Sequence, residues 1–372
     1  MMKTAFVPPP YPYERLSGVR DRAMAHDGGV IDCSIGTPCD PPPTEVLAAL
    51  AQSGSERGYP TSAGSDAFLG AAVDWMGRRF DVEVPMAGVA ACVGTKELVA
   101  SVVQHLALRQ PQRSVVLYPE VSYPTYAMGA QLAGLKAVPV PMVDGRLDLG
   151  SIDSETAAAA LVLWSNSPSN PTGDLDDLSE AAAWGRDHDV VVLSDECYTE
   201  FTWATTPQTI LSTGLSGVLA VHSLSKRSNL AGLRAGFYAG DPDLVGFLRS
   251  VRQHAGLMVP GPVQAAAAVA LADDTHVMQQ RHRYLERLEL VASGLRVAGY
   301  EAVVPSGTFY LWVPIRQDQP DAWVAAEEIA VHSGMLVSPG DLYGSAGAGH
   351  FRVAVVQPTE RLELAMGRLS TQ

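Results

Sequence analysis

The chain has 372 residues and 47% hydrophobic content, enough for two or more domains around large buried cores. Its 40 acidic and 26 basic side chains give a formal net charge of -14, which repels phosphate backbones and anionic lipid and argues against nucleic-acid binding. The four cysteines lack a C-x-x-C pair, so we expect small buried thiols in a reduced compartment. The histidines have no ligand spacing, so no metal site is expected. Neither a signal peptide nor a span of roughly 20 apolar residues is evident, so a cytoplasmic protein outside the membrane is expected.

The predicted elements divide the chain into three parts. Residues 1–44 are rich in Pro and Gly, which predicts an extended arm that contributes to a smaller domain. Over residues 45–255, continuously apolar runs alternate with helical patterns, which predicts a large α/β domain with a mostly parallel sheet flanked by helices. Residues 256–372 contain a long helical pattern over 263–298 and then two-period runs, which predicts a smaller α+β domain. The main predicted strands are 114–118, 160–164, 190–193, 218–221, 308–313 and 350–355, and the helices of the large domain include 176–188 and 241–252.

One lysine stands where a ligand of an open α/β sheet binds, just beyond the carboxyl end of a strand. The strand 218–221 is followed by His222-Ser223-Leu224-Ser225-Lys226 and, eight residues after the lysine, by Arg234. A lysine here can bond to an aldehyde while the hydroxyls and the arginine hold a phosphate. A lone lysine is more often a solvated loop residue, but the whole string is far more specific. Pyridoxal phosphate carries both an aldehyde and a phosphate.

Four further strand ends carry residues that suit such a cofactor. Asp195 can pair with a protonated pyridine nitrogen, although a helix-capping aspartate is about as plausible for this residue alone. Asn170, in an Asn-Pro-Thr-Gly run that alone would be merely a turn, can donate to a phenolate oxygen. The turn Gly94-Thr95-Lys96 opens a helix, where free N–H groups can bind phosphate or simply turn the chain. Tyr123 can stack on a flat ring or belong to the core.

In this order the motifs resemble the fold-type I, class I and II pyridoxal-phosphate-dependent aminotransferases, over roughly residue 32 to the C-terminus. The resemblance implies an aspartate aminotransferase-like fold, with a seven-stranded type of sheet in the large domain. It also implies that Lys226 bonds to the cofactor aldehyde and that Asp195 pairs with the pyridine nitrogen. The other cofactor contacts that it implies are Asn170 and Tyr198 at the ring oxygen, Tyr123 on the ring face, and Ser223, Ser225, Arg234, Gly94, Thr95 and Lys96 at the phosphate.

The same resemblance implies a homodimer and a substrate site. Tyr59, in Gly58-Tyr59-Pro60-Thr61, resembles the tyrosine that reaches the phosphate of the neighbouring subunit. Arg352 matches the arginine that binds the substrate α-carboxylate, and Gly36 lies where a backbone N–H assists it. The guanidinium fork also suits a carboxylate on general grounds, with a surface strand arginine as the alternative reading of Arg352.

The strings around Lys96, Tyr123 and Lys226 are most similar to the actinobacterial type of N-succinyldiaminopimelate aminotransferase. This implies glutamate as donor and N-succinyl-2-amino-6-oxopimelate as acceptor, in lysine and diaminopimelate synthesis. Lys96, Arg57 and Arg227 are candidate cations for the distal part of such an acceptor. The alternatives are an aspartate, alanine or LL-diaminopimelate aminotransferase, a transaminase of a specialised pathway, and a C–S β-lyase. A cofactor-sensing regulator would need a basic DNA-binding module, and we find no such pattern near the N-terminus.

Overall fold

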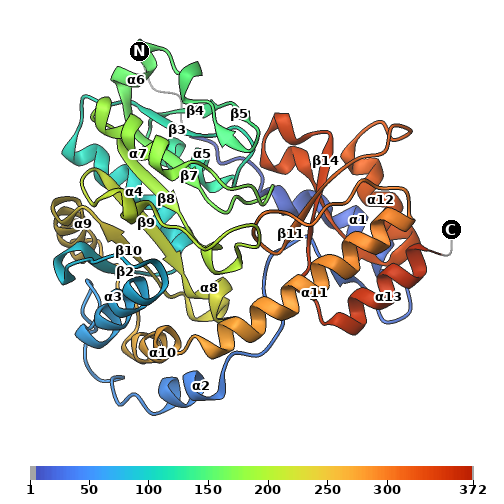
Figure 1. Cartoon of the computed structure of the whole chain (residues 1–372), viewed down its shortest axis with the longest axis horizontal. Coiled ribbons are helices and arrows are strands. Elements are labelled where there is room, and N and C mark those ends of the chain that lie inside the picture. Colours follow the sequence, from blue (N-terminus) through green and yellow to red (C-terminus); the bar gives the residue numbers. More distant parts are fainter. Residues whose placement is uncertain (1–5, 371–372) are drawn as a thin grey trace.

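A seven-stranded sheet forms the centre of the fold (Figure 1), in a computed structural model that describes residues 6–370. The strand order is β2-β10-β9-β8-β7-β3-β4, and β10 runs antiparallel to both of its neighbours while the other pairs are parallel. This confirms the predicted α/β sheet, because each of the four strands expected in this region begins within one residue of its predicted start. The strands are β2 (Val89–Cys92), β3 (Val115–Pro119), β4 (Lys136–Val140), β7 (Ala160–Asn166), β8 (Val191–Asp195), β9 (Val218–Ser223) and β10 (Gly236–Gly240).

Helices cover both faces of this sheet, which explains why its central strands are apolar up to the polar residues at their carboxyl ends. On one face Leu193 and Leu219 pack against α4, α5 and α9, and on the other Val192 and Ala220 pack against α3, α7 and α10. Aspartates begin two of these helices where the sequence predicts them, since the Asp177 and Asp241 carboxylates accept bonds from N–H groups of the first turn. The bounds are α3 (Asp66–Phe80), α4 (Thr95–Arg109), α5 (Thr125–Leu132), α7 (Leu178–Asp187), α9 (Pro242–His254) and α10 (Gly261–Ala272).

The prediction of one long helix over 263–298 is wrong, because the helix is interrupted between α10 and α11 (Thr275–Val297). Asp273 has extended backbone angles, and its carboxylate accepts a bond from the backbone N–H of Thr275 at 2.8 Å. Aspartate favours such bonds over a helix interior, so it separates two helices that hydrophobic spacing alone would join.

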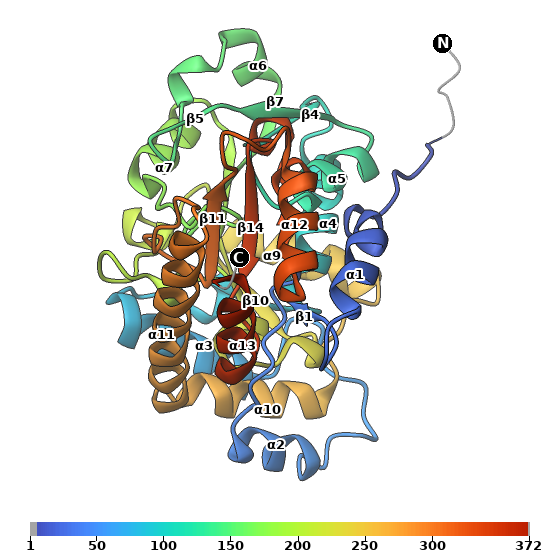
Figure 2. The same ribbon diagram turned by 90° about the vertical axis from the view of Figure 1, so that its right-hand side faces the viewer.

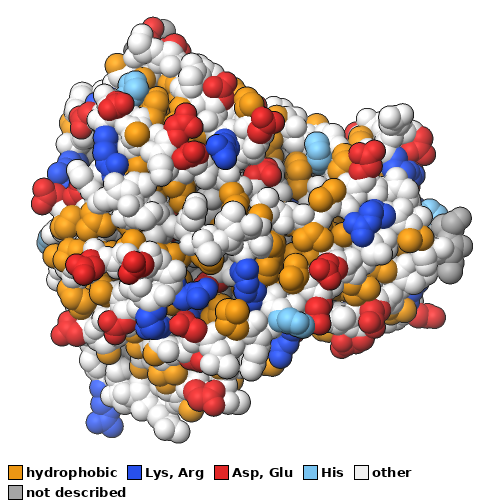
Figure 3. All heavy atoms as spheres, viewed as in Figure 1, with side chains coloured by type: hydrophobic (Ala, Val, Ile, Leu, Met, Phe, Trp, Pro, Cys, Tyr) orange, Lys and Arg blue, Asp and Glu red, His pale blue; other side chains and the backbone are white. Residues whose placement is uncertain are grey.

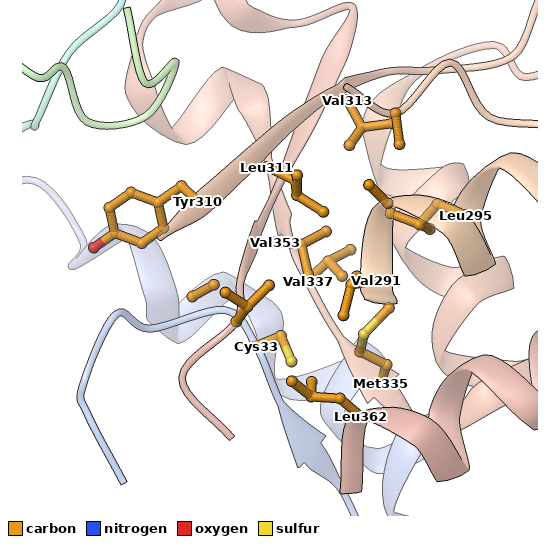
Figure 4. Packing of buried hydrophobic residues seen from close by; sticks show 14 of the residues in the cluster. Cys33, Val291, Leu295, Tyr310, Leu311, Val313, Met335, Val337, Val353 and Leu362 are labelled. Atoms are coloured by element: carbon orange, nitrogen blue, oxygen red, sulfur yellow. The ribbon is translucent and has the colours of Figure 1, made fainter. Parts of the chain in front are cut away.

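A second core surrounds a three-stranded antiparallel sheet of order β11-β14-β13, which fits the predicted α+β arrangement after residue 256. Figure 2 shows α11, α12 and α13 around β11 and β14, and Figure 4 shows side chains such as Val291, Leu311, Val353 and Leu362 meeting between them. The elements are β11 (Tyr310–Pro314), β13 (Ser338–Pro339), β14 (His350–Ala354), α12 (Ala322–Ser333) and α13 (Thr359–Leu369).

The N-terminal region is more structured than the extended arm that its composition predicts. A short 3-10 helix, η1 (Pro12–Leu16), continues into α1 (Ser17–Met24), which contacts α12, and β1 (Ile31–Asp32) pairs in parallel with β12 (Met335–Leu336). Leu16 is buried against Leu336 and Tyr343, and this tertiary packing explains the helix better than its local sequence does. The remaining described elements are α2 (Thr44–Ala51), α6 (Ser154–Ala159), α8 (Leu224–Arg227), β5 (Met142–Val143) and β6 (Arg146–Leu147), with short 3-10 turns between them.

Several predictions from composition concern the thiols and the surface. Cys33 and Cys92 are buried as predicted, whereas Cys39 is exposed and Cys197 is half-buried, which corrects the expectation that all four thiols are buried. Acidic and basic side chains are interspersed over the face in Figure 3. Within residues 6–370, no helix is long and apolar enough to cross a membrane, and no group of three His, Cys, Asp or Glu side chains is placed to hold a metal ion.

Candidate active site

One cavity of about 530 Å³ lies at the carboxyl ends of the central strands and gathers most of the predicted site residues. This is where an open α/β sheet places its ligands, because the parallel strands all end at that edge. The loop after β1 and strands β11 and β14 close the opposite side, so both cores contribute. The predicted residues that line the cavity are Gly36, Thr95, Lys96, Tyr123, Asn170, Asp195, Tyr198, Ser223, Ser225, Lys226, Arg234 and Arg352.

Lys226 lies on α8, directly after β9, and is a half-buried residue of the cavity lining. Its Nζ donates a hydrogen bond to the carbonyl oxygen of Gly36. Burial, together with the nearby guanidinium groups of Arg352 and Arg234, lowers the pKa of Lys226 to about 8, although Cys197 and Asp195 act in the opposite direction. A neutral amine is therefore far more accessible near neutral pH than in an ordinary lysine, as nucleophilic and general-base chemistry requires.

Asp195, at the end of β8, is a buried carboxylate that has hydrogen bonds but no ion pair among the described residues. It accepts a bond from the Tyr126 hydroxyl at 2.8 Å and one from the backbone N–H of Cys197 at 3.2 Å. Burial raises the pKa of Asp195, because the desolvated carboxylate lacks a close cation. A cationic N–H group bound in the cavity would supply this missing partner.

A second end of the cavity is shaped to receive an anion. Gly94 precedes the first turn of the 15-residue helix α4, whose free N–H groups carry the positive end of the helix dipole. The φ of Gly94 is 73°, and a Cβ at this position would lie 2.2 Å from Nη2 of Arg234. Only glycine therefore leaves room for this guanidinium beside the helix start. Thr95, Ser223 and Ser225 add hydroxyl groups to the same lining.

Arg352, on β14, forms the other cationic end of the cavity. Its Nη1 donates to Oδ1 of Asn170 and its Nη2 donates to the carbonyl oxygen of Ser34, both at 2.6 Å. The guanidinium carbon lies 4.0 Å from the ring centre of Tyr310 and 4.7 Å from that of Tyr343. The side chain is thus held by hydrogen bonds and by two aromatic faces, while its buried Nε has no hydrogen-bond partner among the described residues.

Three of the proposed site residues have surroundings that the sequence did not specify. The Tyr198 and Tyr310 hydroxyl oxygens are 2.8 Å apart. The amine of Lys96 donates to the Tyr11 hydroxyl at 3.1 Å and lies 4.7 Å from the ring centre of Tyr11. Tyr59 is not in the cavity of its own chain, and its side chain is 100% exposed.

Neither Arg57 nor Arg227, the other two candidate cations for a distal substrate group, lines the cavity. Arg227 is buried in ion pairs with Glu200 at 3.4 Å and Asp274 at 2.9 Å, so it is not available to a ligand. Sequence reasoning assigned no role to several lining residues: Tyr11, Tyr13, Tyr126, Cys197 and Tyr310. Tyr126 and Cys197 lie close in sequence to predicted residues, but the others come from distant segments that only the fold brings to the site.

The comparisons with known proteins agree with this geometry. Residues 29–369 match the family model described as aminotransferase class I and II. The chain is 40% identical to the 4-dedimethylamino-4-oxo-anhydrotetracycline transaminase OxyQ of Streptomyces rimosus, over 97% of this chain and 99% of the relative. It is 34% identical to the LL-diaminopimelate aminotransferase of Desulforudis audaxviator, over 97% and 95% of the two chains.

Among solved structures, the chain resembles a probable N-succinyldiaminopimelate aminotransferase from Thermus thermophilus. The TM-score is 0.85, at 29% identity, with 96% of this chain and 99% of that chain covered. The match of the family model to nearly the whole chain, together with relatives of this identity and coverage, shows that the protein belongs to the class I and II aminotransferase family.

Proposed function

We propose that this aminotransferase takes an amino group from glutamate and passes it to N-succinyl-2-amino-6-oxopimelate, a step in diaminopimelate and lysine synthesis. The family uses pyridoxal 5'-phosphate as its cofactor. The observation that carries the proposal is one cavity lined by a lysine of lowered pKa, a buried arginine and a buried carboxylate that has no ion pair among the described residues. The lysine and the carboxylate suit the cofactor, and the arginine suits an amino-acid substrate.

The residues present fit the cofactor at both of its ends. Asp195 would hold the pyridine nitrogen, since this buried carboxylate lacks an ion pair among the described residues. The space left by Gly94 next to Arg234 would hold the phosphate, with Thr95, Ser223 and Ser225 as further donors and the backbone of Lys96 in the same helix turn. Tyr123 would stack on the ring, while Asn170 and Tyr198 would donate to its oxygen.

Lys226 does two tasks in this proposal. Its neutral amine would hold the cofactor through its aldehyde group, with loss of water, and when free it would accept the proton from the substrate's α-carbon. The bound cofactor supplies the electron sink that makes this proton removable. The amine, held near the carbonyl of Gly36, lies between the two cationic ends of the cavity, and the lowered pKa of Lys226 favours the neutral form.

Arg352 would bind the α-carboxylate of each substrate, assisted by the backbone N–H of Gly36. Its guanidinium is already oriented by Asn170 and Ser34, so little side-chain freedom is lost when a carboxylate binds. Because Asn170 is also assigned to the cofactor, one amide would link the positions of the cofactor ring and the substrate.

The distal carboxylate of a long acceptor needs another cation. Lys96 is the remaining lysine in the lining, and its amine donates to the Tyr11 hydroxyl, whereas Arg57 and Arg227 are not part of the lining. Lys96 is therefore the residue that we assign to a distal anionic group. The similarity to the Thermus structure supports this acceptor class.

A homodimer is part of the proposal. In an isolated chain the Tyr59 ring is fully exposed to solvent. In a dimer it would reach the phosphate of the neighbouring subunit. Light scattering on the purified protein tests this, because a monomer with full cofactor occupancy would contradict it.

Two alternatives are kept because relatives favour them. The similarity to LL-diaminopimelate aminotransferases supports a dicarboxylate acceptor without the succinyl group, and the similarity to OxyQ supports a specialised pathway. A C–S β-lyase would use nearly the same cofactor residues. The test is a substrate screen that follows the cofactor's absorbance change with glutamate, aspartate, alanine and LL-diaminopimelate, followed by acceptor screening with glutamate as donor.

The outcomes of the screen are distinct. Rapid change with glutamate and turnover with N-succinyl-2-amino-6-oxopimelate are expected. Preference for LL-diaminopimelate would replace the acceptor assignment, and release of pyruvate and ammonia from cystathionine without a keto acceptor would indicate a lyase. No absorbance change with any amino acid would overturn the transaminase proposal.

A further inference from the structure

Tyr310 contacts both the cofactor end and the substrate end of the proposed active site. Its hydroxyl oxygen lies 2.8 Å from that of Tyr198, and its ring centre lies 4.0 Å from the guanidinium carbon of Arg352. The third contact is with Gly36, where a Cβ would lie 2.0 Å from the Tyr310 hydroxyl oxygen. The Tyr310 side chain is 2% exposed, so these are contacts within a desolvated site.

The backbone explains how Tyr310 reaches this position. It is the first residue of β11, and on the neighbouring β14 its direct partner is Ala354, while Arg352 lies opposite Trp312. Tyr310 and Arg352 are therefore diagonal neighbours on one face of the pair, within reach of an aromatic side chain. Figure 4 shows the Tyr310 ring at the edge of the second core, with its hydroxyl directed away from the other labelled side chains.

The two facing hydroxyls constrain each other's protons. Each phenol has one O–H proton to donate, although its oxygen can also accept. If the Tyr198 hydroxyl donates to the oxygen of the cofactor ring, the 2.8 Å bond between the tyrosines can form only with Tyr310 as donor. Donation into the Tyr198 oxygen polarises its O–H group and strengthens the bond that Tyr198 donates onward.

We propose that Tyr310 is a positioning residue that acts on the cofactor through its hydroxyl and on the substrate carboxylate through its ring. The hydroxyl orients and polarises Tyr198, and the ring face holds the guanidinium of Arg352. Gly36 is required at its position because Tyr310 occupies the space that a side chain would need. This inference rests on the proposed function, since it takes from it the roles of Tyr198 and Arg352.

Two substitutions separate the two actions. Tyr310→Phe keeps the ring and removes the hydroxyl, whereas Tyr310→Leu removes both. The holoenzyme's visible absorbance is titrated with pH in the wild type, in both variants and in Tyr198→Phe, and KM for glutamate is measured alongside. Tyr300→Phe is the matched control, because its buried hydroxyl also has a hydrogen bond, to Gln319 at 2.9 Å, but does not line the cavity.

For Tyr310→Phe we expect the titration midpoint to move by about 0.5 to 1 pH unit, in the same direction as in Tyr198→Phe, with KM unchanged within about twofold. The double variant Tyr198→Phe/Tyr310→Phe should shift no further than Tyr198→Phe alone. For Tyr310→Leu we expect the same spectral shift and, in addition, a KM raised by about 2- to 30-fold, because the cation–π contact is lost. Tyr300→Phe should match the wild type in both measurements.

A midpoint in Tyr310→Phe equal to that of the wild type, with Tyr198→Phe shifted, would overturn the role of the hydroxyl. Equal KM values in the Phe and Leu variants would overturn the role of the ring. If the Tyr310 variants do not fold, Gly36→Ala provides the test, since its methyl group must displace the Tyr310 hydroxyl and should produce the spectral shift. The titration needs no amino-acid substrate, so a failed donor screen would refute the proposed function without deciding this inference.

Discussion

Replacing Gly94 by alanine should weaken cofactor binding as well as destabilise the fold. The added methyl group would lie 2.2 Å from Nη2 of Arg234, so the guanidinium must leave the start of α4. The loss of one hydrogen bond from a charged group, about 1.5 to 3 kcal/mol, corresponds to a Kd for pyridoxal phosphate raised about 10- to 150-fold. Because Gly94 has a positive φ, alanine at this position also lowers the free energy of unfolding by about 1 to 3 kcal/mol.

Titration of the apoprotein with pyridoxal phosphate, followed by visible absorbance, measures this Kd, and urea unfolding measures stability. Gly217→Ala is the matched control, because Gly217 has a φ of 71° with no neighbouring atom within 4 Å of the new Cβ and precedes β9 at the end opposite the site. The control should lose stability but keep the wild-type Kd. A Gly94→Ala variant that binds the cofactor as tightly as the control would refute the phosphate assignment.

Four further predictions concern the arginine and the buried titratable groups. Arg352→Lys should lower kcat/KM for glutamate by about 10- to 100-fold, because an ammonium cannot replace the two-pronged guanidinium contact, and an unchanged value in steady-state kinetics would contradict its role. The rate at which the apoprotein bonds pyridoxal phosphate should rise with pH through about 8, the lowered pKa of Lys226, and a midpoint near 10.5 in stopped-flow measurements would contradict this. For the same reason the unfolded chain binds more protons than the native apoprotein between pH 8 and 10.5, so apoprotein stability should increase over this range. Burial raises the pKa of Glu196 to about 7, so its native form binds more protons than the unfolded chain, and stability should fall as pH rises from about 4.5 to 7. Glu196→Gln should flatten this slope in urea unfolding, and an unaltered slope would show that Glu196 is not its source.

Much of the large sheet and of its ligand edge follows from local sequence. Apolar runs such as Val191 to Leu193 form buried strands, and parallel strands end at one edge, which brings together residues that are far apart in the chain. The sequence therefore predicts that Asp195 and Lys226 lie at this edge, and both line the cavity there. The aspartate caps of α7 and α9 were predictable for the same local reason, since the capping bonds span only two or three residues.

Other features depend on contacts that no local pattern reveals. The helices of the N-terminal region are decided by packing against distant elements, such as Leu16 against Leu336. Tyr310 is a residue of an apolar strand run, and its hydroxyl acquires a partner only when β11 is set against the loop after β8. Sequence periodicity indicates which face of a strand a residue occupies, but it does not identify the polar group that the side chain contacts.

The central claim is that Lys226 carries the cofactor. Borohydride reduction of the holoenzyme fixes the cofactor to the amine that holds it, and peptide mapping then identifies that residue among the chain's four lysines. We predict one label per chain, on the peptide that contains Lys226. A label on Lys96, or no label in a protein that shows the cofactor's absorbance, would contradict the account.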